Sequence, residues 1–467
     1  MAAAALIALT LLRLVVAALV PLSPDEAYYW VWSRALAAGY PDHPPMVALW
    51  IRVGTLIAGD DALGIRLLGP LSVGIASIAL FDAGECLLPG CRAGLRAAAL
   101  LNATLLFGVG AVIMTPDTPL LFFWTCCLWA SARLVCDGSA AWWLVIGFFA
   151  GLAMISKYTA AFLWLGIPLW LLITPAPRPW LRRPAPWLGA LLGIALFLPV
   201  VLWNAHYGWA SFVRQGGRLE VWRPLDAARF LAELLLGQAG LVTPLVFAFC
   251  AGGMVVATRQ SWRTGNPRWT LLASLTLPAV VVFVQHAFGD RVQGNWPAII
   301  YPAAGIASAA LQRPVWQRLE RPALAIGVAM TLLAYAQAAF TLLPLPVRLD
   351  PTALRLSGWV GLADQVEKTR RREGASFVAA DQYGLVSEFA RLLPPDVPVI
   401  AIEPRWRLFN LPRFNPDGEV GLMVLNGRGG EATTIGEAQR RRGPDLIQSY
   451  RLQTISRPPL AVLLPRP

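Results

Sequence analysis

The chain has 467 residues, of which 57% are hydrophobic and 14% are charged, whereas about a quarter of the residues in soluble domains are charged. Together with a mean hydropathy of +0.56, this composition excludes a disordered or fibrous chain and an ordinary cytosolic protein. The net charge is +12, and of the 39 basic residues only Lys157 and Lys368 are lysines. The placement of the arginines decides whether this charge indicates nucleic acid or a membrane.

Apolar runs long enough to cross a membrane, which takes about 20 residues, recur through the first three quarters of the chain. They predict about 11 transmembrane helices, near 2–20, 66–86, 94–113, 117–136, 141–155, 157–173, 186–204, 234–257, 269–288, 295–311 and 322–344. The first run lacks a basic start, so a retained anchor is expected rather than a cleaved signal peptide. The run 45–58 is too short to span and is expected to lie in the interface or to re-enter.

The arginines follow these predicted spans. If the N-terminus is cytoplasmic, all five short cytoplasmic loops and their edges carry arginine, namely Arg92, Arg96, Arg133, Arg178, Arg182, Arg183, Arg259, Arg263, Arg268, Arg313, Arg318 and Arg321. This positive-inside pattern accounts for the basic charge, and no nucleic-acid partner is expected. Most ionisable groups outside these loops then fall on the outer face. A transporter would be expected to place them at mid-membrane, so the distribution favours a one-sided active site.

Residues 345–467 have a different character, with short strand-like runs at 376–380, 398–402, 420–425 and 450–455 and a helical stretch at 385–393. They predict a small periplasmic α/β domain after a transmembrane module of residues 1–344. No cysteine lies in this region, so the domain is expected to fold without disulfides.

The first outer loop reads Ser23-Pro24-Asp25-Glu26-Ala27-Tyr28-Tyr29-Trp30. Ser23 as N-cap, Pro24 at the first helical position and Glu26 at the third form a capping box, which assigns both carboxylates to a helix start. The functional alternative is that adjacent carboxylates beside aromatic rings act as a general base and orient a hydroxyl. The helix is expected under either interpretation.

The same loop continues to Gly39-Tyr40-Pro41-Asp42-His43-Pro44-Pro45-Met46. With the Asp-Glu-Ala-Tyr-Tyr run, it resembles the bacterial protein-mannosyltransferase-like enzymes of the GT-C superfamily, which include lipid A aminoarabinose transferases and rhizobial galacturonosyltransferases. Further matches are Thr115–Pro119, Ser156–Thr159, Asn295–Pro297 and the tail stretch Tyr383–Pro394.

The resemblance implies a GT-C-like fold in the bacterial inner membrane and a polyprenyl-phosphate-linked sugar as donor. It also implies transfer at the periplasmic face to a lipid or glycan, with lipid A or lipopolysaccharide core favoured, and Asp25 as the essential acid. Many relatives carry lysine where this chain has His43, so binding of the donor phosphate there is pH-dependent or has moved to another cation.

The candidate residues fall into three groups. The catalytic group is Asp25 as base with Glu26 and Asp117; the donor-phosphate group is Lys157, Arg66, His43 and Arg291; and the acceptor or lid group is Arg214, Arg218, Trp222, Tyr28 and Tyr29. Structural alternatives remain open for three of them. Asp117 can serve a helix N-terminus, Arg66 can anchor the second span, and loop 205–233 can be an interfacial amphipathic helix.

No resident cofactor is expected, because Asp-x-Asp, Gly-x-Gly-x-x-Gly and phosphate-loop patterns are absent from the sequence. The histidines lack metal-ligand spacing, so no metal site is assigned, while use of a divalent cation stays open. A monomer among membrane lipids is expected. Two alternatives remain: a lipid or polysaccharide transporter, and a protein O-glycosyltransferase with the same chemistry on another acceptor.

Overall fold

A computed structural model of the protein describes residues 1–216, 224–416, 418–427, 434–456, 458 and 460–467. The chain forms two compact units. Unit 1 comprises residues 1–14, 42–47 and 68–334, and unit 2 comprises residues 15–41, 48–67 and 335–467.

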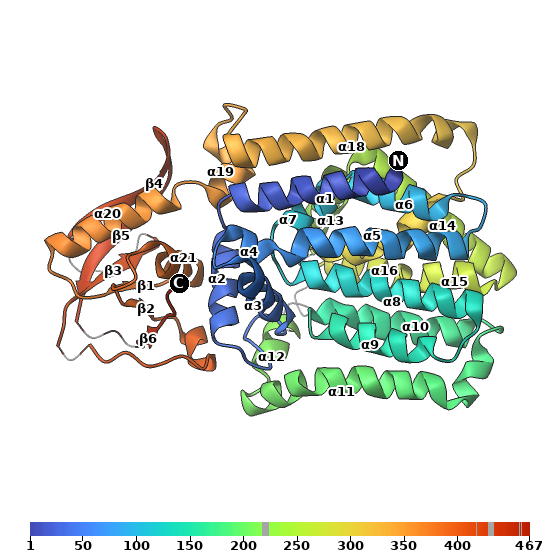
Figure 1. Ribbon diagram of the computed structural model, residues 1–467, viewed down its shortest axis with the longest axis horizontal. Coiled ribbons are helices and arrows are strands. Elements are labelled where there is room, and N and C mark those ends of the chain that lie inside the picture. Colours follow the sequence, from blue (N-terminus) through green and yellow to red (C-terminus); the bar gives the residue numbers. More distant parts are fainter. Residues whose placement is uncertain (217–223, 417, 428–433, 457, 459) are drawn as a thin grey trace. The chain divides into compact units, whose positions relative to one another are not determined.

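Unit 1 is helical, and its long helices α5, α8, α9 and α11 run side by side (Figure 1). Its helices are α5 (Leu68–Leu87), α6 (Ala93–Asn102), α7 (Leu105–Val112), α8 (Asp117–Asp137), α9 (Trp142–Met154), α10 (Ala161–Ile173), α11 (Pro184–His206), α12 (Ala210–Gly216), α13 (Pro224–Leu241), α14 (Pro244–Thr264), α15 (Pro267–Ser274), α16 (Leu277–His286) and α17 (Tyr301–Ser308). Helices α1 (Ala2–Leu19) and α18 (Pro314–Phe340) contribute residues to both units.

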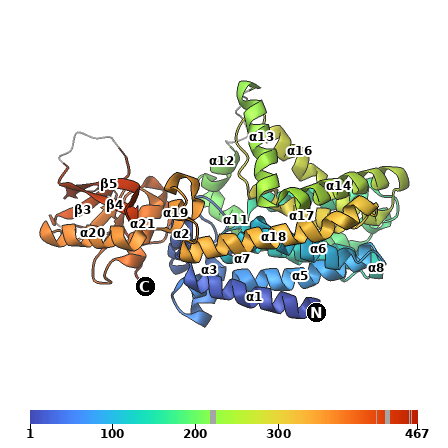
Figure 2. The same ribbon diagram turned by 90° about the horizontal axis from the view of Figure 1, so that it is seen from above.

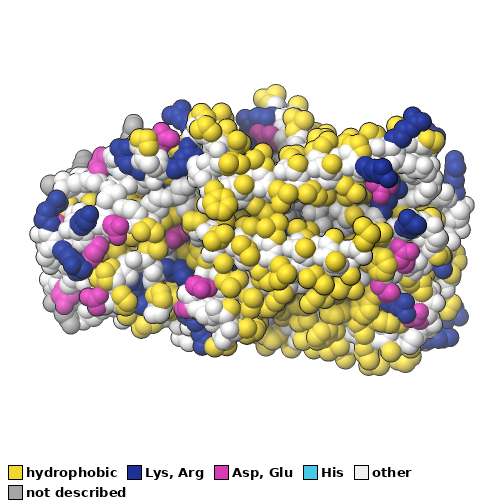
Figure 3. Space-filling view, turned by 45° about the horizontal axis from the view of Figure 1, so that its top comes forward, with side chains coloured by type: hydrophobic (Ala, Val, Ile, Leu, Met, Phe, Trp, Pro, Cys, Tyr) yellow, Lys and Arg dark blue, Asp and Glu magenta, His cyan; other side chains and the backbone are white. Residues whose placement is uncertain are grey.

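The membrane-spanning character of these helices is confirmed, but their predicted number is not. Among the described residues, six helices are long and apolar enough to cross a membrane, or up to eight if each of two bent pairs is one span. Figure 3 shows hydrophobic side chains spread over the helices of unit 1. Those on its surface include Ile75, Ile78, Leu191 and Leu202, which suits an environment of lipid.

One predicted span has the wrong bounds. Residues 234–257 are not one helix, because α13 and α14 meet there at 111°. The break lies at Thr243, which has φ +67° and precedes Pro244. A residue before proline is disfavoured in the helical region, so the apolar run continues while the helix cannot. A second break of 69° separates α6 from α7 inside the predicted span 94–113.

The arginine-bearing connections of unit 1 lie at one end of the helices. The turns α5–α6, α8–α9, α10–α11, α14–α15 and α17–α18 all fall there (Figures 1 and 2). Arg133 pairs with Asp82 at 3.7 Å and Asp137 at 3.1 Å, and Arg96 pairs with Glu320 at 3.2 Å. The one-sided distribution is therefore a property of the structure, while its assignment to the cytoplasm stays a prediction.

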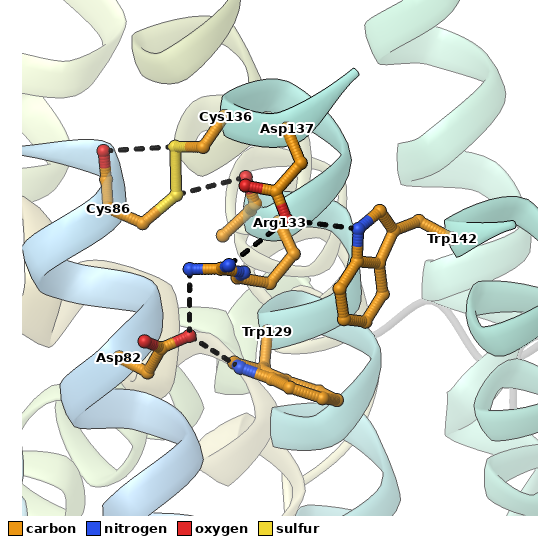
Figure 4. Close-up of a disulfide and its surroundings, with 8 residues drawn as sticks. Asp82, Cys86, Trp129, Arg133, Cys136, Asp137 and Trp142 are labelled. Atoms are coloured by element: carbon orange, nitrogen blue, oxygen red, sulfur yellow. Dashed lines mark hydrogen bonds and ion pairs between the residues drawn. A yellow bond between two sulfur atoms is a disulfide. The ribbon is translucent and has the colours of Figure 1, made fainter. Parts of the chain in front are cut away.

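A disulfide joins the ends of two helices at this arginine-rich end. Cys86, near the end of α5, is bonded to Cys136, near the end of α8 (Figure 4). Beside it, Arg133 contacts Asp82 and Asp137, and the indole groups of Trp129 and Trp142 donate to these same carboxylates. The bond and the polar network together tie α5 to α8.

The C-terminal part of unit 2 is a six-stranded sheet in the order β4-β5-β3-β1-β2-β6. Its strands are β1 (Val378–Ala380), β2 (Val399–Ala401), β3 (Gly421–Leu425), β4 (Gly436–Arg442), β5 (Asp445–Ile455) and β6 (Val462–Leu463). The pairs β1–β2 and β1–β3 are parallel, and the others are antiparallel. Phe377, Ala379, Ile400 and Met423 form a core cluster on the sheet. The four predicted strands and the predicted helix are all present.

The helices of unit 2 come from both ends of the chain. They are α2 (Pro24–Arg34), α3 (Met46–Ala58), α4 (Ala62–Arg66), α19 (Pro351–Leu356), α20 (Trp359–Arg372) and α21 (Tyr383–Leu392). Helix α21 packs directly on α2. The compact unit that contains the predicted domain 345–467 therefore also includes segments of the first outer loop.

Glu388 on α21 is a buried carboxyl group in this packing. Among the described residues its Oε1 finds no hydrogen-bond partner, and burial raises its pKa from the ordinary 4.5 to about 8. The charged groups that act on it are Arg391, Glu26, Arg440 and Arg66. At neutral pH Glu388 is therefore mainly protonated.

The disulfide predicts the thiol count of the purified protein. Under denaturing but non-reducing conditions, alkylation should modify four cysteines, because Cys91, Cys126, Cys127 and Cys250 are free and disulfide sulfur does not react. Reduction before alkylation should raise the count to six, measured by intact mass. Six modified cysteines without reduction would contradict the bond.

Glu388 predicts a pH dependence of stability. Between pH 4.5 and about 8 the unfolded chain releases the proton that the folded protein retains, so stability falls as pH rises through this window. Glu388→Gln should remove this fall and be more stable than wild type at pH 8, with the difference shrinking toward pH 5, measured by thermal unfolding in detergent.

Glu367 on α20 provides the matched control with the opposite sign. Its hydrogen bond from Arg370 lowers its pKa, so its contribution is present at neutral pH and is lost as pH falls through the lowered value. Glu367→Gln should therefore lose stability at neutral pH. The same pH trend in both variants would contradict the assignment.

Candidate active site

The start of α2 forms a capping box, as its sequence predicts. Ser23 is the N-cap, its Oγ accepts from the Glu26 backbone N–H at 3.4 Å, and Glu26 Oε2 accepts from the Ser23 N–H at 3.0 Å. Pro24 occupies the first helical position, where its missing N–H leaves no bond unmade. This geometry fixes the directions of the two neighbouring carboxylates.

Glu26 also forms a closed ion pair with Arg66 at the end of α4. Arg66 Nε and Nη2 donate to the two carboxylate oxygens at 2.6 and 2.7 Å, and the remaining donors reach the carbonyl groups of Ala17, Val20 and Pro21. All five N–H donors of a guanidinium are thereby used. Both side chains are fully buried. The structure thus brings two candidates together, but leaves neither with a free polar edge for a ligand.

Asp25 differs from its neighbour in exposure. Its side chain is 40% exposed, whereas that of Glu26 is 0% exposed. Asp25 Oδ1 accepts a hydrogen bond from the Tyr383 hydroxyl at 2.9 Å, and Oδ2 lies 3.9 Å from an amino nitrogen of Arg355. Of the two adjacent carboxylates, Asp25 is therefore the one that can meet a substrate.

An aromatic cluster lies beneath Asp25 in unit 2. Tyr28 contacts Tyr383 at a centroid distance of 4.6 Å and Trp406 at 5.4 Å, and Trp32 stacks on Tyr40 at 4.1 Å. Tyr28 and Tyr29, both predicted as acceptor contacts, are buried. Their position supports the packing of α2 and does not present open ring faces to a sugar.

The second polar cluster lies within unit 1, where Lys157 Nζ is 2.7 Å from both oxygens of Asp117. Asn295 Nδ2 donates to Asp117 Oδ2 at 2.6 Å. Asp117 is also the first residue of α8, so its position agrees with the helix-start alternative, and its ion pair with Lys157 is a contact that the sequence does not predict. Asp117, predicted as a catalytic residue, and Lys157, predicted as a phosphate ligand, therefore neutralise each other's charge.

The remaining candidates are distributed over unit 1. Arg214 on α12 pairs with Asp42 at 2.7 Å, and Gln215 donates to the Asp42 carbonyl at 2.8 Å. His43 follows Asp42 and is partly buried. The exposed Arg291 pairs with Glu233 at 2.6 Å. Arg218 and Trp222 lie outside the described residues.

Tyr383 and Arg355 were not among the sequence candidates. The sequence signal for Tyr383 was the tail motif that it opens, which identifies a helix but not a contact 358 residues away in the chain. No local pattern marks Arg355. Within the described ranges, no group of three or more His, Cys, Asp or Glu side chains is arranged to hold a metal ion.

Comparison with known proteins gives consistent matches. A family model described as dolichyl-phosphate-mannose-protein mannosyltransferase matches residues 42–203. The lipid A galacturonosyltransferase RgtD of Rhizobium johnstonii is 28% identical over 373 residues, which cover 78% of this chain and 76% of that protein. The lipopolysaccharide core galacturonosyltransferase RgtA of the same species is 27% identical over 402 residues, which cover 80% and 76%.

The fold matches a solved structure over nearly the whole chain. ArnT from Cupriavidus metallidurans, bound to undecaprenyl phosphate, superposes with a TM-score of 0.67 at 15% identity over 96% of this chain and 97% of that one. The chain is thus similar over most of its length to two galacturonosyltransferases and shares the fold of ArnT, which agrees with the expected resemblance to membrane glycosyltransferases of the GT-C superfamily.

Proposed function

We propose that this glycosyltransferase moves a sugar from a polyprenyl-phosphate donor to a hydroxyl group of lipid A or of the lipopolysaccharide core, with Asp25 as general base. The observation that carries the proposal is the contrast at the start of α2. Asp25 is accessible and held by one hydrogen bond on Oδ1, while Glu26 beside it is sealed by Arg66.

The reaction needs little from the protein beyond positioning and one proton acceptor. Asp25 Oδ2 takes the proton of the acceptor hydroxyl as its oxygen attacks the anomeric carbon. The bond from that carbon to the phosphate oxygen breaks, and the lipid phosphate leaves with the bonding electron pair. Protonated Asp25 then returns its proton to water. No resident cofactor enters this scheme.

The donor is supported by the undecaprenyl phosphate bound to the ArnT structure and by the cations available in unit 1. Among the predicted phosphate ligands, Arg66 is closed by its five hydrogen bonds. We assign the phosphate to Lys157, with His43 and Arg291 as further candidates. Lys157 would exchange part of its contact with Asp117 for the donor, while Asn295 continues to hold Asp117.

A uronic acid is the proposed sugar. Both curated relatives are galacturonosyltransferases. Arg355 lies 3.9 Å from Asp25, and its side chain is 70% exposed; a guanidinium favours a carboxylate and repels an amino sugar. Purified protein should therefore use polyprenyl-phosphate galacturonic acid faster than polyprenyl-phosphate aminoarabinose. The family model that matches residues 42–203 is described as a protein mannosyltransferase. Transfer of the sugar to a peptide and not to lipid A would therefore make a protein the acceptor.

Asp25→Asn is expected to lower kcat by about 10²- to 10⁴-fold, the usual contribution of a positioned base, without loss of fold. Product formation with a radiolabelled donor measures the rate, and thermal unfolding measures the fold. Glu26→Gln is the adjacent comparison. It breaks the buried pair with Arg66 and should mainly lower stability. Full activity of Asp25→Asn would refute the base assignment.

The Asp117–Lys157 pair can be tested separately for structure and for donor binding. Each single neutral variant, Asp117→Asn or Lys157→Gln, leaves one buried charge unpaired and should lower the thermal stability. The double variant should recover stability. Its KM for donor should nevertheless remain raised, because the phosphate ligand is absent. Recovery of both stability and KM would show that the pair is only structural.

We propose that the transfer site faces the periplasm of an inner-membrane protein. In a Cys91→Ser background, a membrane-impermeant thiol reagent applied to intact spheroplasts should label Arg214→Cys on α12 but not Arg182→Cys, which lies at the arginine-rich end. Labelling of both positions in permeabilised cells is the control. The reverse accessibility would overturn the proposed orientation.

A further inference from the structure

Helix α21 of the C-terminal region approaches the start of α2 more closely than any side chain would allow. A Cβ atom on Gly384 would lie 2.8 Å from Pro24 Cβ, a distance that real Cβ atoms do not adopt. The glycine therefore permits the two helix starts to touch. Because Pro24 precedes Asp25 and Gly384 follows Tyr383, this contact brings the tyrosine to the candidate base.

The Tyr383 hydroxyl makes a directed contact with Asp25. It donates to Oδ1 at 2.9 Å, while within the described part of the chain the exposed Arg355 lies 3.9 Å from Oδ2 as an ion-pair neighbour. A carboxylate held through one oxygen is fixed in rotation about its Cβ–Cγ bond. Its other oxygen then keeps a lone pair in a constant direction, which is what a general base requires.

The tyrosine ring is itself held from two sides. The Tyr28 ring lies 4.6 Å from the Tyr383 ring, and the Arg405 guanidinium lies 4.3 Å above the Tyr383 ring centroid. A cation over an aromatic face is attracted by the π system. It also draws electron density from the phenol, which strengthens the hydroxyl as a hydrogen-bond donor. The position of the hydroxyl is thus set by contacts that do not involve Asp25.

We propose that Tyr383 is a positioning residue of the transfer reaction, which fixes the Asp25 carboxylate so that Oδ2 accepts the proton of the acceptor hydroxyl. Tyr383 keeps its own proton throughout and touches neither sugar nor phosphate. This inference rests on the proposed function of Asp25. It assigns the C-terminal region a direct part in the chemistry, since without α21 the base would have no fixed rotamer.

The test is Tyr383→Phe, which retains the ring and its contacts with Tyr28 and Arg405 but removes the hydroxyl. We expect kcat to fall about tenfold, as for loss of one hydrogen bond to a charged group, with KM for the polyprenyl-phosphate donor unchanged. The pH–rate profile of Tyr383→Phe should differ from that of the wild type, because the hydrogen bond to the proposed base is absent. A purely structural tyrosine would alter neither kcat nor the profile.

Tyr450→Phe is the matched control. Tyr450 is a buried tyrosine of the same unit whose hydroxyl donates to Gln448 at 3.1 Å, so its removal should leave kcat, KM and the pH–rate profile at wild-type values. Gly384→Ala gives an independent test. Its methyl group must displace Pro24, and it should reproduce the fall in kcat with unchanged KM.

Asp25→Asn separates the two ways in which the inference could fail. If Asp25→Asn retains full activity, the proposed base is wrong. If Asp25→Asn is inactive while Tyr383→Phe matches wild type in kcat and in the pH–rate profile, Asp25 remains the base and only the positioning role of Tyr383 is refuted.

Discussion

The buried ion pair between Glu26 and Arg66 is the interaction on which the candidate site depends. It uses both oxygens of one carboxylate and every donor of one guanidinium, and it joins α4 to the start of α2 and to the chain segment before it. Removing either charge would leave the other buried and unpaired, which costs several kcal/mol. The ion pair therefore fixes the backbone direction at Asp25 independently of the contacts that the Asp25 side chain makes.

Two adjacent acidic residues thus acquire different chemical roles from their surroundings. Glu26 points into the protein, where the capping box and Arg66 satisfy it. Asp25, one residue earlier on the same helical turn, points about 100° away and remains accessible. A carboxylate that accepts a proton from a substrate during turnover must be accessible to it, and of these two carboxylates Asp25 is the exposed one. The helix-start interpretation of the motif is therefore confirmed for Glu26, while the functional interpretation is the proposal made for Asp25.

Local features of this site follow from the sequence, while its distant contacts do not. Ser23, Pro24 and Glu26 form the capping box that their spacing predicts, because a helix start depends on residues within four positions. The partner of Glu26 is 40 residues away and the partner of Asp25 is 358 residues away. Neither separation leaves a periodic or compositional trace. In the sequence Arg66 is an isolated cation. The prediction that it binds phosphate therefore does not include its ion pair with Glu26, which uses the guanidinium.

Because sequence patterns report local features, they also did not predict the helix break at Thr243 or every strand of the tail. The apolar run over 234–257 is continuous in composition, but the backbone turns at Thr243 because Pro244 follows it. In the tail, the buried strands β1, β2 and β3 are apolar and were predicted. Strand β4 reads Gly-Glu-Ala-Gln-Arg-Arg-Arg and was missed, because as the edge strand it buries few side chains. An apolar pattern in a sequence marks buried side chains. A polar edge strand such as β4 buries few side chains and therefore lacks this pattern.

Ion pairing determines which charged groups of this protein are available to a substrate. Lys157 is neutralised by Asp117, Arg214 by Asp42 and Arg291 by Glu233, all at 2.7 Å or less. In the proposed reaction a lipid phosphate binds such a pair by taking over part of the cation. For Lys157, the buried cation of the three, the pair avoids the penalty of an unpaired buried charge in the free enzyme. Asp25 has the opposite arrangement, with a neutral hydroxyl on one oxygen and an exposed arginine 3.9 Å from the other. The accessible Oδ2 is the feature on which the proposed role of Asp25 as general base rests, whereas the strong pairs occupy the carboxylates of Asp117, Asp42 and Glu233.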